Sequence, residues 1–82
     1  MSNGIRITGP IEFVLKDGPS NVGNCPSVLR VDEGYLVVGK IVDAETRARA
    51  AAIGAEHNSG IADDEDVVFV PANVLDRLPA AV

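Results

Sequence analysis

The sequence is poor in the residues that build most catalytic and metal sites. Among its 82 residues there is one cysteine, one histidine and no tryptophan. A single cysteine excludes a disulfide within the chain, and one cysteine with one histidine falls short of the ligands that a zinc site requires. We therefore expect no metal, no cofactor and no catalytic residues, and hence a protein that is not an enzyme.

Basic residues are also scarce. Seven lysines and arginines are scattered among twelve aspartates and glutamates, which gives a net charge of −5. Direct binding of nucleic acid or of an anionic membrane requires clustered lysine and arginine, so we expect neither. No apolar run approaches the ~18 residues of a transmembrane helix, and the N-terminal segment lacks the pattern of a signal peptide. These absences together predict a cytoplasmic protein.

Aromatic residues make up 4% of the chain, although 46% of the residues are hydrophobic. The core must therefore be built from Val, Ile, Leu and Ala, and a chain of this length buries only about 60% of its unfolded surface. We expect one small domain over residues 1–82 with a thin core, which the pairing of two chains into a homodimer would extend.

The stretch from Gly23 to Val42 predicts a β-hairpin. Two runs rich in β-branched residues, 28–31 and 35–42, flank a turn, Asp32-Glu33-Gly34, whose glycine can adopt a positive φ without steric cost. Both faces of the second run are largely apolar, so we expect it to be a central strand covered on both sides. Gly39 is expected to mark a bulge or a close backbone approach.

Further strands are predicted on either side of the hairpin. Apolar and polar residues alternate from Ile5 to Lys16, which indicates one half-buried strand, or two short strands broken at Gly9-Pro10. Residues 67–70 form a continuous apolar run and are expected to be a strand that is buried on both faces.

Two helices complete the prediction. Residues 44–55 are rich in alanine and follow Asp43, a good N-cap, so we expect a helix with its alanine face packed on the sheet, ended by residues 56–60. Pro71 should open a short final helix that Pro79 stops. The apolar stripe of that helix is Val74, Leu75 and Leu78. The fold class is therefore α+β, with a small, mostly antiparallel sheet of about four to five strands, one Ala-rich helix and a short C-terminal helix.

Two segments are candidates for contact with a partner. The loop of residues 17–27 is rich in Gly, Pro, Ser and Asn, and loops on a rigid scaffold often carry sites. The acidic run of residues 63–66 is expected to be exposed. The candidate interaction residues are Asn24, Cys25, Ser27, Asp63, Asp64 and Glu65. Contiguous acids do not match the spaced ligands of an EF-hand, and the loop lacks the lysine of a P-loop, so a solvated turn and an ordinary loop are the simpler interpretations.

Cys25 and His57 suggest one alternative chemistry. A thiolate–imidazole pair would permit acyl transfer if the fold brought the two side chains together. Any chain with one residue of each type satisfies this pattern, and a small hydrophobic role for Cys25 near a strand start is the simpler interpretation.

The hairpin and the last strand resemble a family of short, uncharacterised actinobacterial proteins. The hairpin match consists of Gly-x-Cys-Pro-Ser-Val at 23–28, Arg30, the Asp-Glu-Gly turn at 32–34 and Val-Val-Gly-Lys at 37–40, and the second match is EDVVFVPANVL at 65–75. The sequence departs from the family by its Ala-rich insert over 44–62 and by the lack of a Trp or Gln near the second strand. Members are often encoded beside helix-turn-helix regulators, so the resemblance implies an accessory or regulatory role, and it implies no catalytic residues.

These features favour a non-enzymatic, acidic protein–protein interaction module that is accessory to a transcriptional regulator and binds a basic protein. Two alternatives stay open. One is a small-ligand binder, or a Cys25-dependent enzyme, that uses the 17–27 loop. The other is a structural subunit of a larger assembly.

Overall fold

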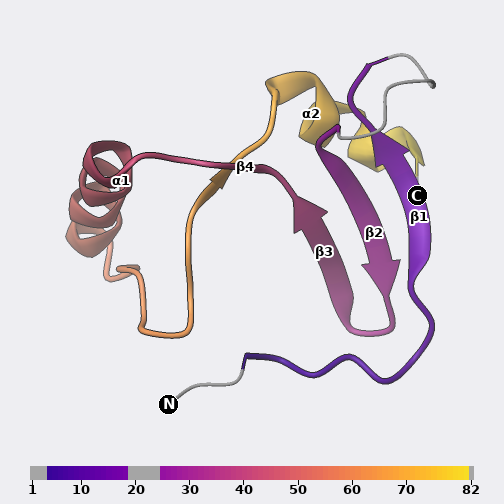
Figure 1. Ribbon diagram of the computed structural model, residues 1–82, viewed down its shortest axis with the longest axis horizontal. Helices are drawn as coiled ribbons and strands as arrows, with labels where there is room; N and C mark the ends of the chain where they lie inside the picture. Colours follow the sequence, from indigo (N-terminus) through magenta and orange to yellow (C-terminus); the bar gives the residue numbers. More distant parts are fainter. Residues whose placement is uncertain (1–3, 19–24, 82) are drawn as a thin grey trace. The chain divides into compact units, whose positions relative to one another are not determined.

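The computed structural model describes residues 4–18 and 25–81 (Figure 1). The elements follow in the order β1 (Glu12–Lys16), β2 (Ser27–Val31), β3 (Gly34–Val38), β4 (Lys40–Ile41), α1 (Ala44–Glu56), β5 (Val68–Phe69) and α2 (Ala72–Ala81). The two helices and the strands confirm the α+β class. The strands form two sheets, one with the order β1-β2-β3 and one that pairs β4 with β5, instead of the single sheet that the sequence predicts.

The chain divides into two compact units, and each is described by itself. The helical unit contains residues 4–6 and 41–68, with α1. The sheet unit contains the described residues between 7 and 40 and between 69 and 81, with β1, β2, β3 and α2. The chain passes from one unit to the other within β4 and β5. One domain over residues 1–82 stays a prediction.

The core of the sheet unit forms where β2 meets α2. β2 is the central strand and pairs antiparallel with β1 and with β3. Its Val28 is fully buried in a cluster with Leu15 of β1 and Val74 of α2. Partly buried residues packed against this cluster are Val14, Val70 and Leu78. Leu75, the third residue of the predicted stripe on α2, is 47% exposed and lies outside the cluster.

β1 is shorter than the alternation of apolar and polar residues predicts, and the alternation of its side chains between the two faces is interrupted. Residues 5–11 lie outside any strand. The β1–β2 register shifts between Phe13 and Leu15, which makes a β-bulge at Val14. A bulge adds a residue to one strand and so reverses which face the following side chain occupies. Leu15 is therefore buried, whereas Phe13 is 61% exposed, and the prediction that these two residues share a buried face is wrong.

β2 and β3 form the predicted hairpin, with a two-residue turn at Asp32-Glu33. Gly34 is the first residue of β3 and does not adopt a positive φ, so the turn does not use the conformational freedom of this glycine. The second run is broken at Gly39, and β3 lies at the edge of its sheet. Val37 and Val38 are 42% and 51% exposed, so the expected central strand with two covered faces is also wrong. A three-stranded sheet has one interior position, and β2 occupies it.

Two other segments are more exposed than the sequence predicts. β5 comprises only Val68 and Phe69, which are 46% and 56% exposed, so the apolar run is not buried on both faces. α1 carries no buried residue, although its alanine face was expected to be a packing surface. An alanine face offers one methyl group per residue, and so little apolar area drives its burial.

Both predicted helices form. α1 begins after Asp43, whose carboxylate accepts a hydrogen bond from the N–H of Thr46 at 2.8 Å, which confirms the N-cap. α2 begins after Pro71, as predicted, but it continues through Pro79 to Ala81. Because Pro79 lies in the last turn, its missing N–H removes a single hydrogen bond and does not end the helix.

The C-terminus of α1 closes in a Schellman motif. Asn58 adopts a φ of 59°, and its N–H donates to the carbonyl of Ala55 at 3.1 Å. The N–H of Ser59 donates to the carbonyl of Gly54 at 2.8 Å. These are the two hydrogen bonds that define the motif. A Cβ at position 54 would collide with the carbonyl oxygen of Ser59, so the close approach of the two backbones requires glycine at this position.

Gly54→Ala is therefore expected to destabilise α1, although alanine normally favours a helix interior over glycine by about 1 kcal/mol. The clash with the backbone of Ser59 forces the helix end or the turn to shift. Thermal unfolding followed by far-ultraviolet circular dichroism should show a lower Tm for Gly54→Ala. The matched control is Gly60→Ala, where a Cβ meets no atom within 4 Å and the Tm should not fall. A Tm at or above the wild-type value in Gly54→Ala would contradict this account of the helix end.

Candidate interaction site

The candidate residues from the sequence fall in different units. Cys25 and Ser27 belong to the sheet unit, whereas Asp63, Asp64 and Glu65 belong to the helical unit. The loop and the acidic run are therefore described one at a time, each within its own unit. His57 also belongs to the helical unit, so the structure gives no paired geometry for the alternative thiol–imidazole chemistry.

The two ends of the 17–27 loop are held together at its base. The N–H of Asp17 donates to the carbonyl of Pro26 at 2.8 Å, and Pro26 is buried. α2 fastens the same end of the sheet, because Asn73 Nδ2 donates to Asp17 Oδ1 at 3.3 Å and Arg77 Nη2 donates to the carbonyl of Lys16 at 2.8 Å. The base of the loop is thus fixed by the sheet and by α2 together.

Two of the loop residues predicted for a site, Cys25 and Ser27, lie at this base. Ser27 is the first residue of β2 and is half-buried, opposite Val38 of β3. Cys25 is half-buried two residues before it. Asn24 lies outside the described residues. The described part of the loop therefore offers two half-buried side chains and no exposed group from the predicted set.

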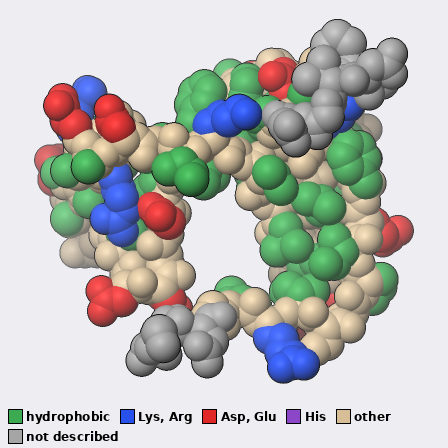
Figure 2. All heavy atoms as spheres, viewed as in Figure 1, with side chains coloured by type: hydrophobic (Ala, Val, Ile, Leu, Met, Phe, Trp, Pro, Cys, Tyr) green, Lys and Arg blue, Asp and Glu red, His purple; other side chains and the backbone are tan. Residues whose placement is uncertain are grey.

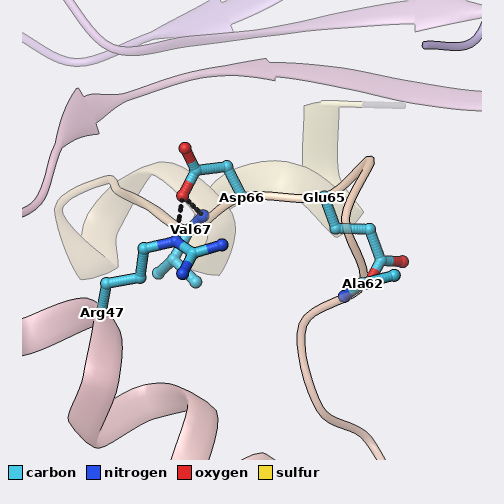
Figure 3. A network of polar contacts seen from close by, with 5 residues as sticks. All are labelled: Arg47, Ala62, Glu65, Asp66 and Val67. Atoms are coloured by element: carbon cyan, nitrogen blue, oxygen red, sulfur yellow. Dashed lines mark hydrogen bonds and ion pairs between the residues drawn. The ribbon is translucent and has the colours of Figure 1, made fainter. Parts of the chain in front are cut away.

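The acidic run forms an exposed turn, as predicted (Figure 3). The N–H of Ala62 donates to Glu65 Oε1 at 2.9 Å, and the N–H of Glu65 donates to the carbonyl of Ala62 at 3.0 Å. This reciprocal pair closes the turn, with Asp63 and Asp64 at its tip. One oxygen of Glu65 is therefore engaged within the chain, and the exposed carboxylates of Asp63 and Asp64 remain the outward part of the run.

Asp66, the last acid of the run, ties the turn to α1. Its Oδ1 accepts hydrogen bonds from the backbone N–H of Val67 at 2.7 Å and from Nε of Arg47 at 2.9 Å, and Figure 3 shows both donors reaching the same oxygen. The Val67 N–H, followed by the Arg47 guanidinium, lowers the pKa of the Asp66 carboxyl. The two side chains are 44% and 72% exposed, so solvent screens the ion pair and its role is to orient the turn. Sequence reasoning missed this pair because no periodic pattern links a helix residue to a later turn.

A second feature that the sequence did not reveal is an apolar surface on the sheet unit. Side chains directly opposite each other in neighbouring strands lie on the same face, so Phe13, Leu29 and Leu36 form a row across β1, β2 and β3. This row faces away from Val28 and its core cluster, and Val38 lies on the same side, two residues beyond Leu36. These four residues, Phe13, Leu29, Leu36 and Val38, are termed the open sheet face.

The open sheet face is accessible in part, because Val31, which lies on the same face at the hairpin end, is buried. Phe13 and Val38 are 61% and 51% exposed, and Leu29 and Leu36 are half-buried between them. Figure 2 shows hydrophobic side chains gathered over the strands of this sheet. The sequence signal for the open sheet face is the apolar character of both faces of the hairpin. This signal predicted that both faces are buried, but it did not indicate which of them α2 covers.

The described ranges 4–18 and 25–81 contain no group of three His, Cys, Asp or Glu side chains placed to hold a metal ion. None of the described helices is long and apolar enough to cross a bilayer.

No protein-family model, curated protein or solved structure has a significant match to the chain. The candidate function therefore depends on the surfaces described above.

The pKa of Asp66 gives a testable pH dependence. Because the fold lowers this pKa below 3.8, the ionised carboxylate favours the folded turn above the unfolded pKa, and this contribution is lost as the pH falls through the lowered folded value. We expect an NMR titration of the Asp66 carboxyl carbon to give a midpoint below 3.8, and we expect Arg47→Gln to raise it. The midpoint should stay partly lowered in that variant, because the Val67 N–H is the larger cause.

The matched control for this titration is Arg49→Gln, which removes an exposed arginine from the same helix. It should leave the Asp66 midpoint unchanged. A midpoint of 3.8 or higher in the unaltered chain would contradict the described contacts of Asp66.

Proposed function

We propose that this chain is a non-enzymatic protein–protein interaction module that binds its partner through the open sheet face. The observation that carries the proposal is the row Phe13–Leu29–Leu36, with Val38 beside it, on the outer side of the three-stranded sheet. Contiguous apolar surface of this kind marks interaction sites in soluble proteins. Phe13 is the most exposed of the four residues, and aromatic side chains are enriched at the centre of interfaces.

The charge of the chain indicates the chemistry of the partner. The chain carries a net charge of −5, and the exposed acids Asp32 and Glu33 stand at the hairpin end of the sheet. A partner with an apolar centre and a basic rim would match both features, and complementary charge would raise its rate of association. A basic regulatory protein is such a partner, and the accessory role that the family resemblance implies agrees with it.

The acidic turn is the second surface that supports a basic partner. Asp63 and Asp64 are exposed at the tip of a turn whose shape is fixed by the Glu65–Ala62 hydrogen bonds and by the Arg47–Asp66 pair. This turn is a further acidic surface, on the helical unit, that a basic partner would complement.

Capture from a native lysate by the immobilised full chain tests the proposal. We expect at least one specific protein to be retained, and Phe13→Ser to reduce its binding by about tenfold or more, because a buried aromatic anchor contributes at least this much at an interface. The matched control is Ile53→Ser, which replaces a side chain of nearly equal exposure, 60% against 61%, on α1.

Retention by Ile53→Ser together with loss by Phe13→Ser is the expected pattern, with circular dichroism showing that both variants are folded. Recovery of no specific protein would count against the interaction module. Equal binding by the two variants would assign the contact to another surface.

A further inference from the structure

The two edges of the three-stranded sheet differ in how they are protected. β1 carries Glu12 and Lys16, follows Pro10 and is bulged at Val14, and all of these features discourage pairing with another strand. β3 has none of them: its five residues, Gly34–Val38, are uncharged and their register with β2 is continuous. An uncharged, regular edge strand is a template for an incoming strand.

The backbone groups available at the β3 edge belong to Tyr35 and Val37. A two-residue turn is closed by a pair that exchanges both backbone hydrogen bonds, and such pairs alternate along an antiparallel ladder. Val31 pairs with Gly34 beside the turn, so Leu36, two residues on, also directs its N–H and C=O toward β2. Tyr35 and Val37 direct theirs away from β2, which leaves two donors and two acceptors for another strand.

We propose that β3 pairs antiparallel with the β3 strand of a second copy of this chain. When Tyr35 of one copy faces Val37 of the other, the two residues exchange both backbone hydrogen bonds, and the same pair recurs on the other side of a two-fold axis at Leu36. Gly34 then faces Val38, so every residue of β3 is paired. Each copy contributes the same strand, as a symmetric interface requires.

The side chains and charges of the strand select this register and this occupant. Each Tyr35 lies beside Val37 of the other copy, an aromatic and β-branched pair that stabilises antiparallel strands. The antiparallel arrangement brings the acidic turn of each copy, Asp32-Glu33, to the end of the pair where the other copy continues to Lys40, and all three residues are exposed. A slip of two residues in either direction shortens the pairing. An acidic turn before the strand and a lysine after it therefore complement each other when the strand pairs with itself.

This inference goes beyond the proposed function, because it concerns the edge of the sheet and a second copy of the chain. Its tests use the purified full chain alone. A chain that dimerises without binding another protein, or that binds another protein as a monomer, would separate the two proposals.

The first test measures the mass of the purified chain by light scattering as its concentration increases. We expect the mass to rise from 8.5 kDa toward twice that value between about 1 and 500 µM, because a five-residue strand pair lies at the small end of interface sizes. Val37→Pro removes an N–H that points away from β2, so it should stay monomeric with an unchanged circular dichroism spectrum. A mass that stays at 8.5 kDa over the whole concentration range would overturn the proposal. This holds even if the β3 edge bound an added extended peptide, because the proposed partner strand is a second copy of the chain.

Disulfide trapping tests the register. In a Cys25→Ala background, Leu36→Cys places the two thiols at the two-fold axis with Cα atoms about 4.5 Å apart, within the reach of a disulfide. The matched control is Val38→Cys, on the same face and more exposed, whose Cα atoms would be about 13 Å apart along the strands.

After oxidation, Leu36→Cys should migrate as a covalent dimer on a non-reducing gel and Val38→Cys as a monomer. Equal trapping of both variants would indicate random collision and would overturn the proposed pairing. Preferred trapping of Val38→Cys would do the same.

Discussion

The contact between Val28 and Val74 is the interaction on which the sheet unit depends. Val28 lies on the central strand and Val74 on α2, and both side chains are fully buried. Leu15 joins them because the bulge at Val14 turns it toward α2 and leaves Phe13 on the other side. One short helix covers one face of a small sheet. The accessible surfaces of the unit follow from this: the face opposite the core, and the edge strand whose backbone is regular and uncharged.

The helical unit is held by a different kind of interaction. α1 has no buried residue, so its definition comes from local hydrogen bonds: the Asp43 N-cap, the Schellman closure at Asn58 and Ser59, and the Arg47–Asp66 pair. Such contacts are exposed and individually weak, but they are directional. They determine where the helix ends and how the acidic turn is oriented. The turn can therefore expose Asp63 and Asp64 at its tip without support from an apolar core.

Local signals in the sequence were sufficient for the elements but not for their burial. The N-cap at Asp43, the hairpin turn at Asp32-Glu33 and the start of α2 after Pro71 are set by a few neighbouring residues, and all three were predictable. Burial depends on what is available to cover a segment, and apolar composition does not contain this information. The β5 run and the second arm of the hairpin were therefore predicted as buried and are exposed. The exposed acidic run was predictable from its charge, whereas the open sheet face required the β1–β2–β3 register and the position of α2.

The face and the edge of the sheet are linked by geometry. A two-fold axis through Leu36, normal to the sheet, keeps equivalent faces of two copies on the same side. Pairing of β3 with itself would therefore place both α2 helices on one side and join two open sheet faces into one apolar surface on the other, with Leu36 of each copy at the centre. The two Phe13 side chains would lie toward the outer strands of this surface, because β1 is the strand farthest from the axis.

A partner of two-fold symmetry, or one with two equivalent apolar segments, would contact both copies at once and gain affinity from simultaneous binding. Self-association would use the edge of the sheet and partner binding would use its face. The two interactions are therefore compatible, and a small sheet with a thin core could present a broader binding surface as a dimer.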